Sequence, residues 1–181
     1  MKERIYKHLS EAGRMTVTSF MKKRRTTIIL AAVTLLLLLL SFPGSLRDAY
    51  NRGGIYLFSN EFLEDIPKRL TGPGRFRFLM QPLMAITLGV LNGLTDARAG
   101  RPPYLYGLLF HRNLRGGLAK SGFSTMANLL LMGISLDVIF QWVILGVAHP
   151  GPALIIGPVL IVGPYTIARA LSNRMAARAN R

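Results

Sequence analysis

An aspartate inside a long apolar segment is the residue of this sequence with the clearest potential for chemistry. Asp137 lies near the midpoint of residues 127–148, most of which are aliphatic. An ionised carboxylate at the centre of a bilayer costs about 2.5–3.5 kcal/mol on insertion scales. No Lys, Arg or His is predicted at mid-depth in any apolar segment. We therefore expect Asp137 to be protonated unless water or a cation reaches it.

Polar and small residues accompany Asp137 on one helical face. Gly133, Asp137 and Gln141 are four residues apart, so they share that face. The preceding apolar segment has a matching face with 3.6-residue periodicity: Gln81, Ala85, Gly89, Asn92 and Asp96. Antiparallel alignment of the two segments by their midpoints places Thr87 at the depth of Asp137. The sequence thus predicts a polar seam or ion site made up of Asp137, Gln141, Gln81, Thr87 and Asn92.

Two interpretations of this seam remain open. A buried membrane carboxylate is the usual candidate for a proton or cation site. A neutral Asp137 that hydrogen-bonds across the bundle or to another subunit would instead hold helices together, by about 1 kcal/mol.

A second group of polar residues lies in the basic stretch that follows the second apolar segment. Its charged members are predicted to contact a lipid phosphate or the acidic surface of a partner: Asp96, Arg98, Arg101, Arg112 and Arg115. Pro102 and Pro103 fix a rigid turn there. Ordinary anchoring of a membrane protein by positive charge explains these arginines without a ligand.

Catalytic and cofactor chemistry find little support in the residues. The chain has no cysteine, and its three histidines, His8, His111 and His149, lie in separate segments. We therefore expect no metal, no cofactor and no enzymatic activity. The net charge of +15 lies beside apolar segments and lacks a nucleic-acid motif, so no nucleic-acid partner is expected.

Four long apolar segments predict an all-α integral membrane protein, a bundle of four transmembrane helices. The predicted spans are residues 26–42, 78–95, 127–148 and 152–170. The first is about 25 Å of helix that Pro43-Gly44 is expected to end, and it is predicted to be an uncleaved anchor. The connecting segments are a basic arm (1–25), a loop with a short amphipathic interfacial helix capped by Ser59 or Asn60 (43–77), a basic loop (96–126) and a tail (171–181).

The distribution of basic residues predicts the orientation. Seventeen of the 23 Lys and Arg residues lie on the side of the two chain ends, against six in residues 43–77. The positive-inside rule then places both ends in the cytoplasm, so residues 43–77 form an outer segment and 96–126 a cytoplasmic loop. Arg75 and Arg77 lie on the wrong side of this rule. We expect a bacterial inner membrane protein.

The fourth apolar segment carries Gly-Pro pairs every six residues. Pro158 and Pro164 remove backbone donors and free the carbonyls of Leu154 and Leu160. Freed carbonyls can bind a cation in discontinuous helices, whereas a merely kinked helix has its loose groups met by neighbours.

The sequence supports three hypotheses for function. The first is an accessory or assembly subunit of a membrane complex, whose partners are other membrane subunits or further copies of the chain. The second is an oligomeric ion or proton channel or carrier that uses Asp137. The third is a lipid-interacting protein that binds anionic headgroups in the bilayer.

Overall fold

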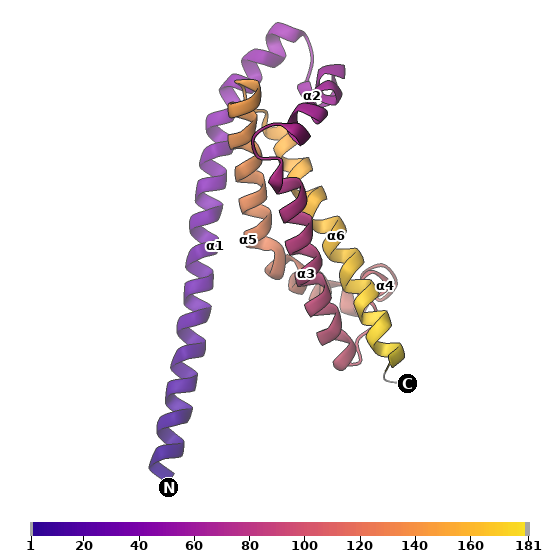
Figure 1. Ribbon diagram of the computed structural model, residues 1–181. Coiled ribbons are helices and arrows are strands. Elements are labelled where there is room, and N and C mark those ends of the chain that lie inside the picture. Colours follow the sequence, from indigo (N-terminus) through magenta and orange to yellow (C-terminus); the bar gives the residue numbers. More distant parts are fainter. Residues whose placement is uncertain (1, 180–181) are drawn as a thin grey trace.

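The protein is entirely helical in the part that the structure describes. The computed structural model describes residues 2–179, and side chains for residues 24–57 and 59–179. In that part there are no strands, and the helices are α1 (Lys2–Arg52), η1 (Tyr56–Phe58, a 3₁₀ helix), α2 (Asn60–Thr71), α3 (Phe76–Arg98), α4 (Tyr104–Phe110), α5 (Arg112–Leu145) and α6 (Pro150–Ala179). Figure 1 shows α3, α5 and α6 side by side, with α1 along one side of them.

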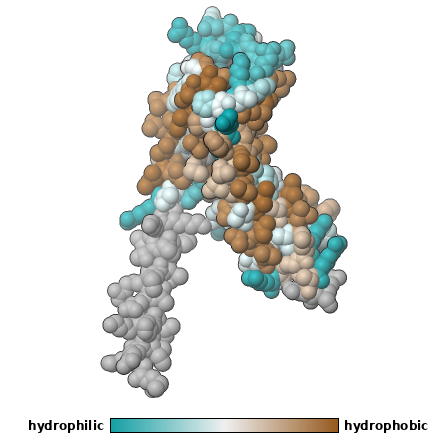
Figure 2. All heavy atoms as spheres, viewed as in Figure 1, coloured by the Kyte–Doolittle hydropathy of each residue, from teal (hydrophilic) through white to brown (hydrophobic). Residues whose placement is uncertain are grey.

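Four of these helices are long and apolar enough to cross a membrane: Arg24–Arg52 of α1, and α3, α5 and α6. Figure 2 shows hydrophobic residues between hydrophilic residues at the two ends. We call these the α2 end and the α4 end, after the short helix found at each (Figure 1). The C-terminal part of α6 and the N-terminal part of α1 both lie toward the α4 end. The architecture is that of a multi-pass membrane protein.

Helix α1 is longer than predicted. The expectation that Pro43-Gly44 ends it is wrong, because the helix continues through Pro43 to Arg52 and ends before Gly53, whose φ is +68°. Proline removes one backbone hydrogen bond, and such a loss is tolerated where neighbouring helices and hydroxyl groups help to satisfy the backbone. The last turns of α1 are also held from outside, since Arg52 forms an ion pair with Glu61 of α2, and Asp48 Oδ2 lies 3.5 Å from His149 Nε2.

A ladder of polar contacts joins α1 to α5. Thr27 donates to Asn128 at 2.6 Å, and the hydroxyls of Thr34 and Ser135 lie 2.9 Å apart. Both pairs are 101 residues apart, so the two helices run parallel with a constant register. On each helix the two contacting residues are seven positions apart, which is the spacing that keeps side chains on the seam between two packed helices. The face of α1 away from this seam is exposed and aliphatic.

The closest packing in the bundle is between α3 and α6. A Cβ on Gly89 would lie 2.6 Å from the carbonyl oxygen of Tyr165, and one on Gly93 would collide with the backbone of Arg169 and the hydroxyl of Ser172. The predicted small-residue face of α3 therefore does allow close approach, but to α6 and not mainly to α5. Between α3 and α5 the contacts are fewer.

Helix α6 is continuous despite its prolines. Pro158 and Pro164 both lie inside the helix, which runs without interruption from Pro150 to Ala179. Gly157 marks the crossing with α5, since a Cβ there would lie 3.2 Å from the backbone nitrogen of Ile134. The interpretation of α6 as a discontinuous, ion-binding helix is thus not supported, and the kinked-helix interpretation fits better.

A substitution at the α3–α6 contact tests this packing. We expect Gly89→Leu to lower the free energy of unfolding by about 1–3 kcal/mol, because the new side chain must push the α6 backbone away. The measurement is thermal or SDS-induced unfolding of the purified protein in detergent.

Gly163→Ala is the matched control, since no atom lies within 4 Å of a Cβ at this position of α6. Equal stability of Gly89→Leu and the wild type would contradict the close contact.

Candidate functional site

Asp137 is the centre of a buried charge network at the α2 end. Its side chain is 0% exposed and forms an ion pair with Arg77 of α3. Arg69 of α2 approaches the same carboxylate, with Nη1 3.4 Å from Oδ2, and Gln141 donates to that oxygen at 2.6 Å. Both arginines are themselves buried, so two positive charges face one negative charge in a site removed from solvent. Nε and Nη2 of Arg69 find no hydrogen-bond acceptor among the described residues.

The expectation that Asp137 has no charged partner is wrong. Midpoint alignment fails because α5 runs from Arg112 to Leu145, so that Asp137 lies only about 12 Å from the end of the helix. The first turn of α3 therefore lies level with Asp137, and Arg77 reaches it from there. Arg77 and Arg69 thus supply the positive charges that midpoint alignment did not predict next to Asp137.

The predicted polar seam is divided by the structure. Gln141 contacts Asp137 and also binds the backbone of His149, accepting from its N–H at 2.8 Å. Gln81 is buried next to Gly133. Thr87 does not join them, because it is exposed and donates to Leu83 of its own helix. Asn92 belongs to a different network, near the α4 end.

This second network is built around Asp96. Its carboxylate accepts from Arg169 Nε at 2.7 Å and from Arg101 Nη1 at 3.2 Å. Arg169 is 1% exposed, donates to the hydroxyl of Tyr165 at 2.8 Å and lies 4.2 Å from the ring centroid of Tyr104. Asn92 donates to the same Tyr165 hydroxyl at 2.8 Å. The network thus joins α3, α4, α6 and the turn after α3.

The other residues that were predicted to contact a lipid or a partner do not form one site. Arg115 donates to the carbonyls of Leu108 and Leu109 at 2.8 and 2.9 Å, which satisfies the C-terminal end of α4. Arg98 and Arg112 are exposed near the α4 end. Of the five, Asp96 is the one that is fully buried, so it positions arginines and does not itself face a ligand.

A polar pocket of about 450 Å³ lies at the α2 end between α1, α2 and α5. His149 and Tyr56 stack in its wall with ring centroids 3.9 Å apart, and Tyr56 donates to Asp65 at 2.5 Å. Burial raises the pKa of Tyr56 to about 12, so this phenol is neutral at physiological pH. Burial also lowers the pKa of His149, although Asp48 lies 3.5 Å from its Nε2.

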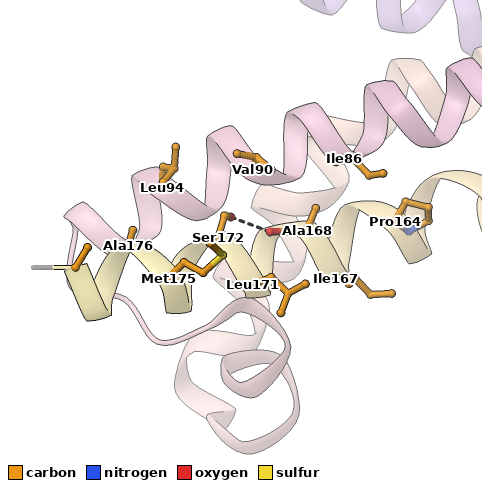
Figure 3. Close-up of a pocket in the computed structure, with 11 residues that line it drawn as sticks. Ile86, Val90, Leu94, Pro164, Ile167, Ala168, Leu171, Ser172, Met175 and Ala176 are labelled. Carbon is orange, nitrogen blue, oxygen red and sulfur yellow. Dashed lines mark hydrogen bonds between the residues drawn. The ribbon is translucent and has the colours of Figure 1, made fainter.

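An apolar groove of about 850 Å³ lies between α3 and α6. Its walls are aliphatic side chains and small residues (Figure 3): Ile86, Val90, Leu94, Pro164, Ile167, Ala168, Leu171, Ser172, Met175, Ala176 and Ala179. The polar residue among them, Ser172, has its hydroxyl turned to the carbonyl of Ala168 at 2.8 Å. The groove therefore offers an apolar ligand a surface without unsatisfied donors.

Neither metal clusters nor known relatives add to these sites. Among the described residues, no group of three or more His, Asp or Glu side chains could hold a metal ion. Comparisons with protein-family models, with curated proteins and with solved structures found no match.

Sequence reasoning missed three arginines that form the two networks. Arg77 and Arg69 were assigned to the outer loop, and Arg169 to the end of the last span. The signal for Arg77 was its conflict with the positive-inside rule, because a cation on the disfavoured side needs a local partner. For Arg169 the signal was its place within an apolar segment, where a charge must be paired.

Removal of the negative charge from the α2-end network tests its role. We expect Asp137→Asn to lower the free energy of unfolding by about 3–5 kcal/mol, because two buried guanidinium groups lose their counter-charge. SDS-induced unfolding in detergent measures the change.

Adding Arg77→Gln to Asp137→Asn should cost less than the two single changes together, since the partners act as a unit. Glu64→Gln, an exposed carboxylate change on α2, is the control and should leave stability unchanged. Strict additivity would argue against the ion pair.

The lowered pKa of His149 predicts that the stability of the protein depends on pH. Its pKa is lower in the folded protein than the ordinary value of about 6.5, so the unfolded chain binds more protons near that pH. Stability is therefore full above pH 6.5 and falls as the pH drops toward the lower pKa of the folded state. We expect the Tm to fall between pH 7.5 and 5.5, and His149→Gln to flatten this dependence. A variant that keeps the full slope would assign the effect to another group.

Proposed function

We propose that the protein is a non-catalytic, lipid-binding protein of the bacterial inner membrane, with both chain ends in the cytoplasm. The observation that carries the proposal is the apolar groove between α3 and α6. Its volume of about 850 Å³ falls in the range of ligand sites, and its polar hydroxyl is already satisfied. An acyl chain is the ligand whose chemistry fits such a wall.

The extent of the groove favours a lipid over a partner helix. Along α6 it runs from Pro164 to Ala179, about 22 Å, and along α3 from Ile86 to Leu94, about 12 Å. Both stretches belong to the α4-end halves of their helices. One leaflet has about 15 Å of hydrocarbon, whereas a partner helix would contact the bundle across about 30 Å. A groove that is confined to the α4-end halves of both helices suits a phospholipid, which occupies one leaflet.

Basic residues at the α4 end support an anionic headgroup. Arg98 continues the line of Ile86, Val90 and Leu94 at four-residue spacing, one turn beyond the groove. A guanidinium at the membrane interface attracts anionic lipids, by about 1 kcal/mol for each basic residue.

The channel or carrier hypothesis is less well supported by the geometry. A cation at Asp137 would face the guanidinium groups of Arg77 and Arg69, which repel it. The contacts instead support a structural role for Asp137, which ties α2 and α3 to α5.

Occupancy of the groove can be tested by native mass spectrometry of protein extracted in mild detergent. We expect the wild type to retain one phospholipid, and Ala176→Trp to lose it because the indole fills the groove. Leu36→Trp, on the exposed face of α1, is the matched control and should retain the lipid. Equal lipid retention by Ala176→Trp and Leu36→Trp would reject the groove as the binding site.

The accessory-subunit hypothesis has one specific observation in its favour. The apolar face of α1 turned away from α5 is exposed, with Ile29, Leu35 and Leu39 each about 60% accessible. This face is available to a transmembrane helix of a partner or a second copy. Leu35→Asn/Leu39→Asn should then break a complex that chemical crosslinking detects in membranes, while Leu91→Asn on α3 leaves it intact. Crosslinking that is equal in both variants would count against this second role.

A further inference from the structure

A second hollow at the α4 end differs in chemistry from the groove. It has a volume of about 260 Å³ and lies between the turn after α3 and the last turns of α6. Three of its six lining residues are arginines. The six are Arg101, Pro103, Asn173, Arg174, Ala177 and Arg178. We call this hollow the arginine pocket. None of the residues that line it is acidic.

The arginine pocket has an excess of positive charge. The carboxylate of Asp96, which pairs with Arg101 of the pocket, also accepts from Arg169. One negative charge is thus shared by two guanidinium groups, while Arg174 and Arg178 add two more positive charges in the same wall. Convergence of several guanidinium groups on one hollow is the arrangement that recognises phosphate, through paired N–H donors in a planar fork.

Two contacts hold the Arg101 side of the pocket in shape. Asn173 is 1% exposed, and its amide donates to the backbone carbonyl of Arg101 at 3.2 Å, which fixes the turn to α6. The carboxylate of Asp96 pairs with the guanidinium of Arg101 at 3.2 Å, and the backbone N–H of Arg101 donates to the carbonyl of Asp96 at 2.9 Å. Gly100, with a φ of +64°, and Pro102 make the turn tight. The Arg101 side of the pocket is therefore formed before any ligand binds, while Arg174 and Arg178 are exposed on α6.

We infer that the arginine pocket binds a phosphate group, either the phosphodiester of an anionic phospholipid or a soluble phosphate compound. The lipid source rests on the proposed function, since Arg178 lies in the same last turn of α6 as Met175 and Ala179, which line the groove. A headgroup in the pocket and a chain in the groove would then belong to one molecule. The soluble source does not depend on the groove.

The experiment compares lipid selection by variants in nanodiscs that contain equal amounts of phosphatidylglycerol and phosphatidylcholine. After gentle release, native mass spectrometry gives the ratio of the two lipids retained. We expect the wild type to favour phosphatidylglycerol about tenfold or more, since hydrogen bonds between charged groups are the strong ones. Arg174→Gln/Arg178→Gln should reduce the ratio to about one. Arg174→Lys/Arg178→Lys should give an intermediate ratio, because the charge stays and the planar fork is lost.

The matched control is Arg112→Gln/Lys120→Gln, which removes two exposed charges near the same end but outside the arginine pocket. It should keep the wild-type ratio. An equal fall of the ratio in the control and in Arg174→Gln/Arg178→Gln would overturn the lipid source, because general surface charge would then explain the selection.

Titration of delipidated protein with inorganic phosphate, followed by calorimetry, tests the soluble source. Binding that Arg174→Gln/Arg178→Gln abolishes, while Ala176→Trp does not, supports a phosphate site that is independent of the groove. If neither lipid selection nor phosphate binding depends on Arg174 and Arg178, the inference is wrong. Retention of uncharged lipid by Arg174→Gln/Arg178→Gln would leave the groove function intact, so the two proposals can fail separately.

Discussion

A carboxylate buried among transmembrane helices needs a counter-charge within a few ångströms, and in this bundle arginines from other segments supply it. Asp137 of α5 is met by Arg77 and Arg69, and Asp96 of α3 is met by Arg169 and Arg101. Helix α3 is thereby tied to α5 near its first turn and to α6 near its last. The depth of α3 against both neighbours is set by these ion pairs, because a shift of one turn would leave charges unpaired in a medium of low dielectric constant. The groove and the arginine pocket both depend on this placement.

The elements of the fold could be predicted more readily than their partners. Long apolar segments between basic clusters were enough to predict four membrane-crossing helices, because the bilayer imposes a length and a polarity on each. Small-residue spacing on α3 predicted a close helix contact, but α5 and α6 both carry small residues that could receive it. Ala168 and Ser172, which meet the glycines of α3, are no more distinctive in the sequence than Gly133 of α5, so the choice of α6 depends on packing of the whole bundle. Pro43 misled the prediction because a proline ends a helix in water more often than in a membrane.

The candidate site shows the same division. Asp137 and Gln141 were correctly placed on one face, since four-residue spacing within a helix fixes this locally. The ion-pair partners of Asp137 are 60 and 68 residues away in the sequence, and no local pattern encodes such distances. Thr87 was placed at the depth of Asp137 because midpoint alignment took residues 127–148 as the helix, whereas α5 begins at Arg112 and ends at Leu145. Side chains as long as arginine also reach across a turn or more, so the position of a backbone is a poor guide to the position of its charge.

The parallel contact between α1 and α5 has a consequence for the order in which the chain is assembled in the membrane. Synthesis delivers α1 about a hundred residues before the residues of α5 that it contacts. Before α5 is present, the hydroxyl of Thr34 can donate to the carbonyl of Leu30 in its own helix, a hydrogen bond of 2.7 Å in the structure. Ser41 donates in the same way to Leu38 at 2.8 Å. Helix α1 can therefore lie in lipid without α5 while the hydroxyls of Thr34 and Ser41 are hydrogen-bonded. When α5 is inserted, its hydrogen bonds with the hydroxyls of Thr27 and Thr34 set its depth relative to α1.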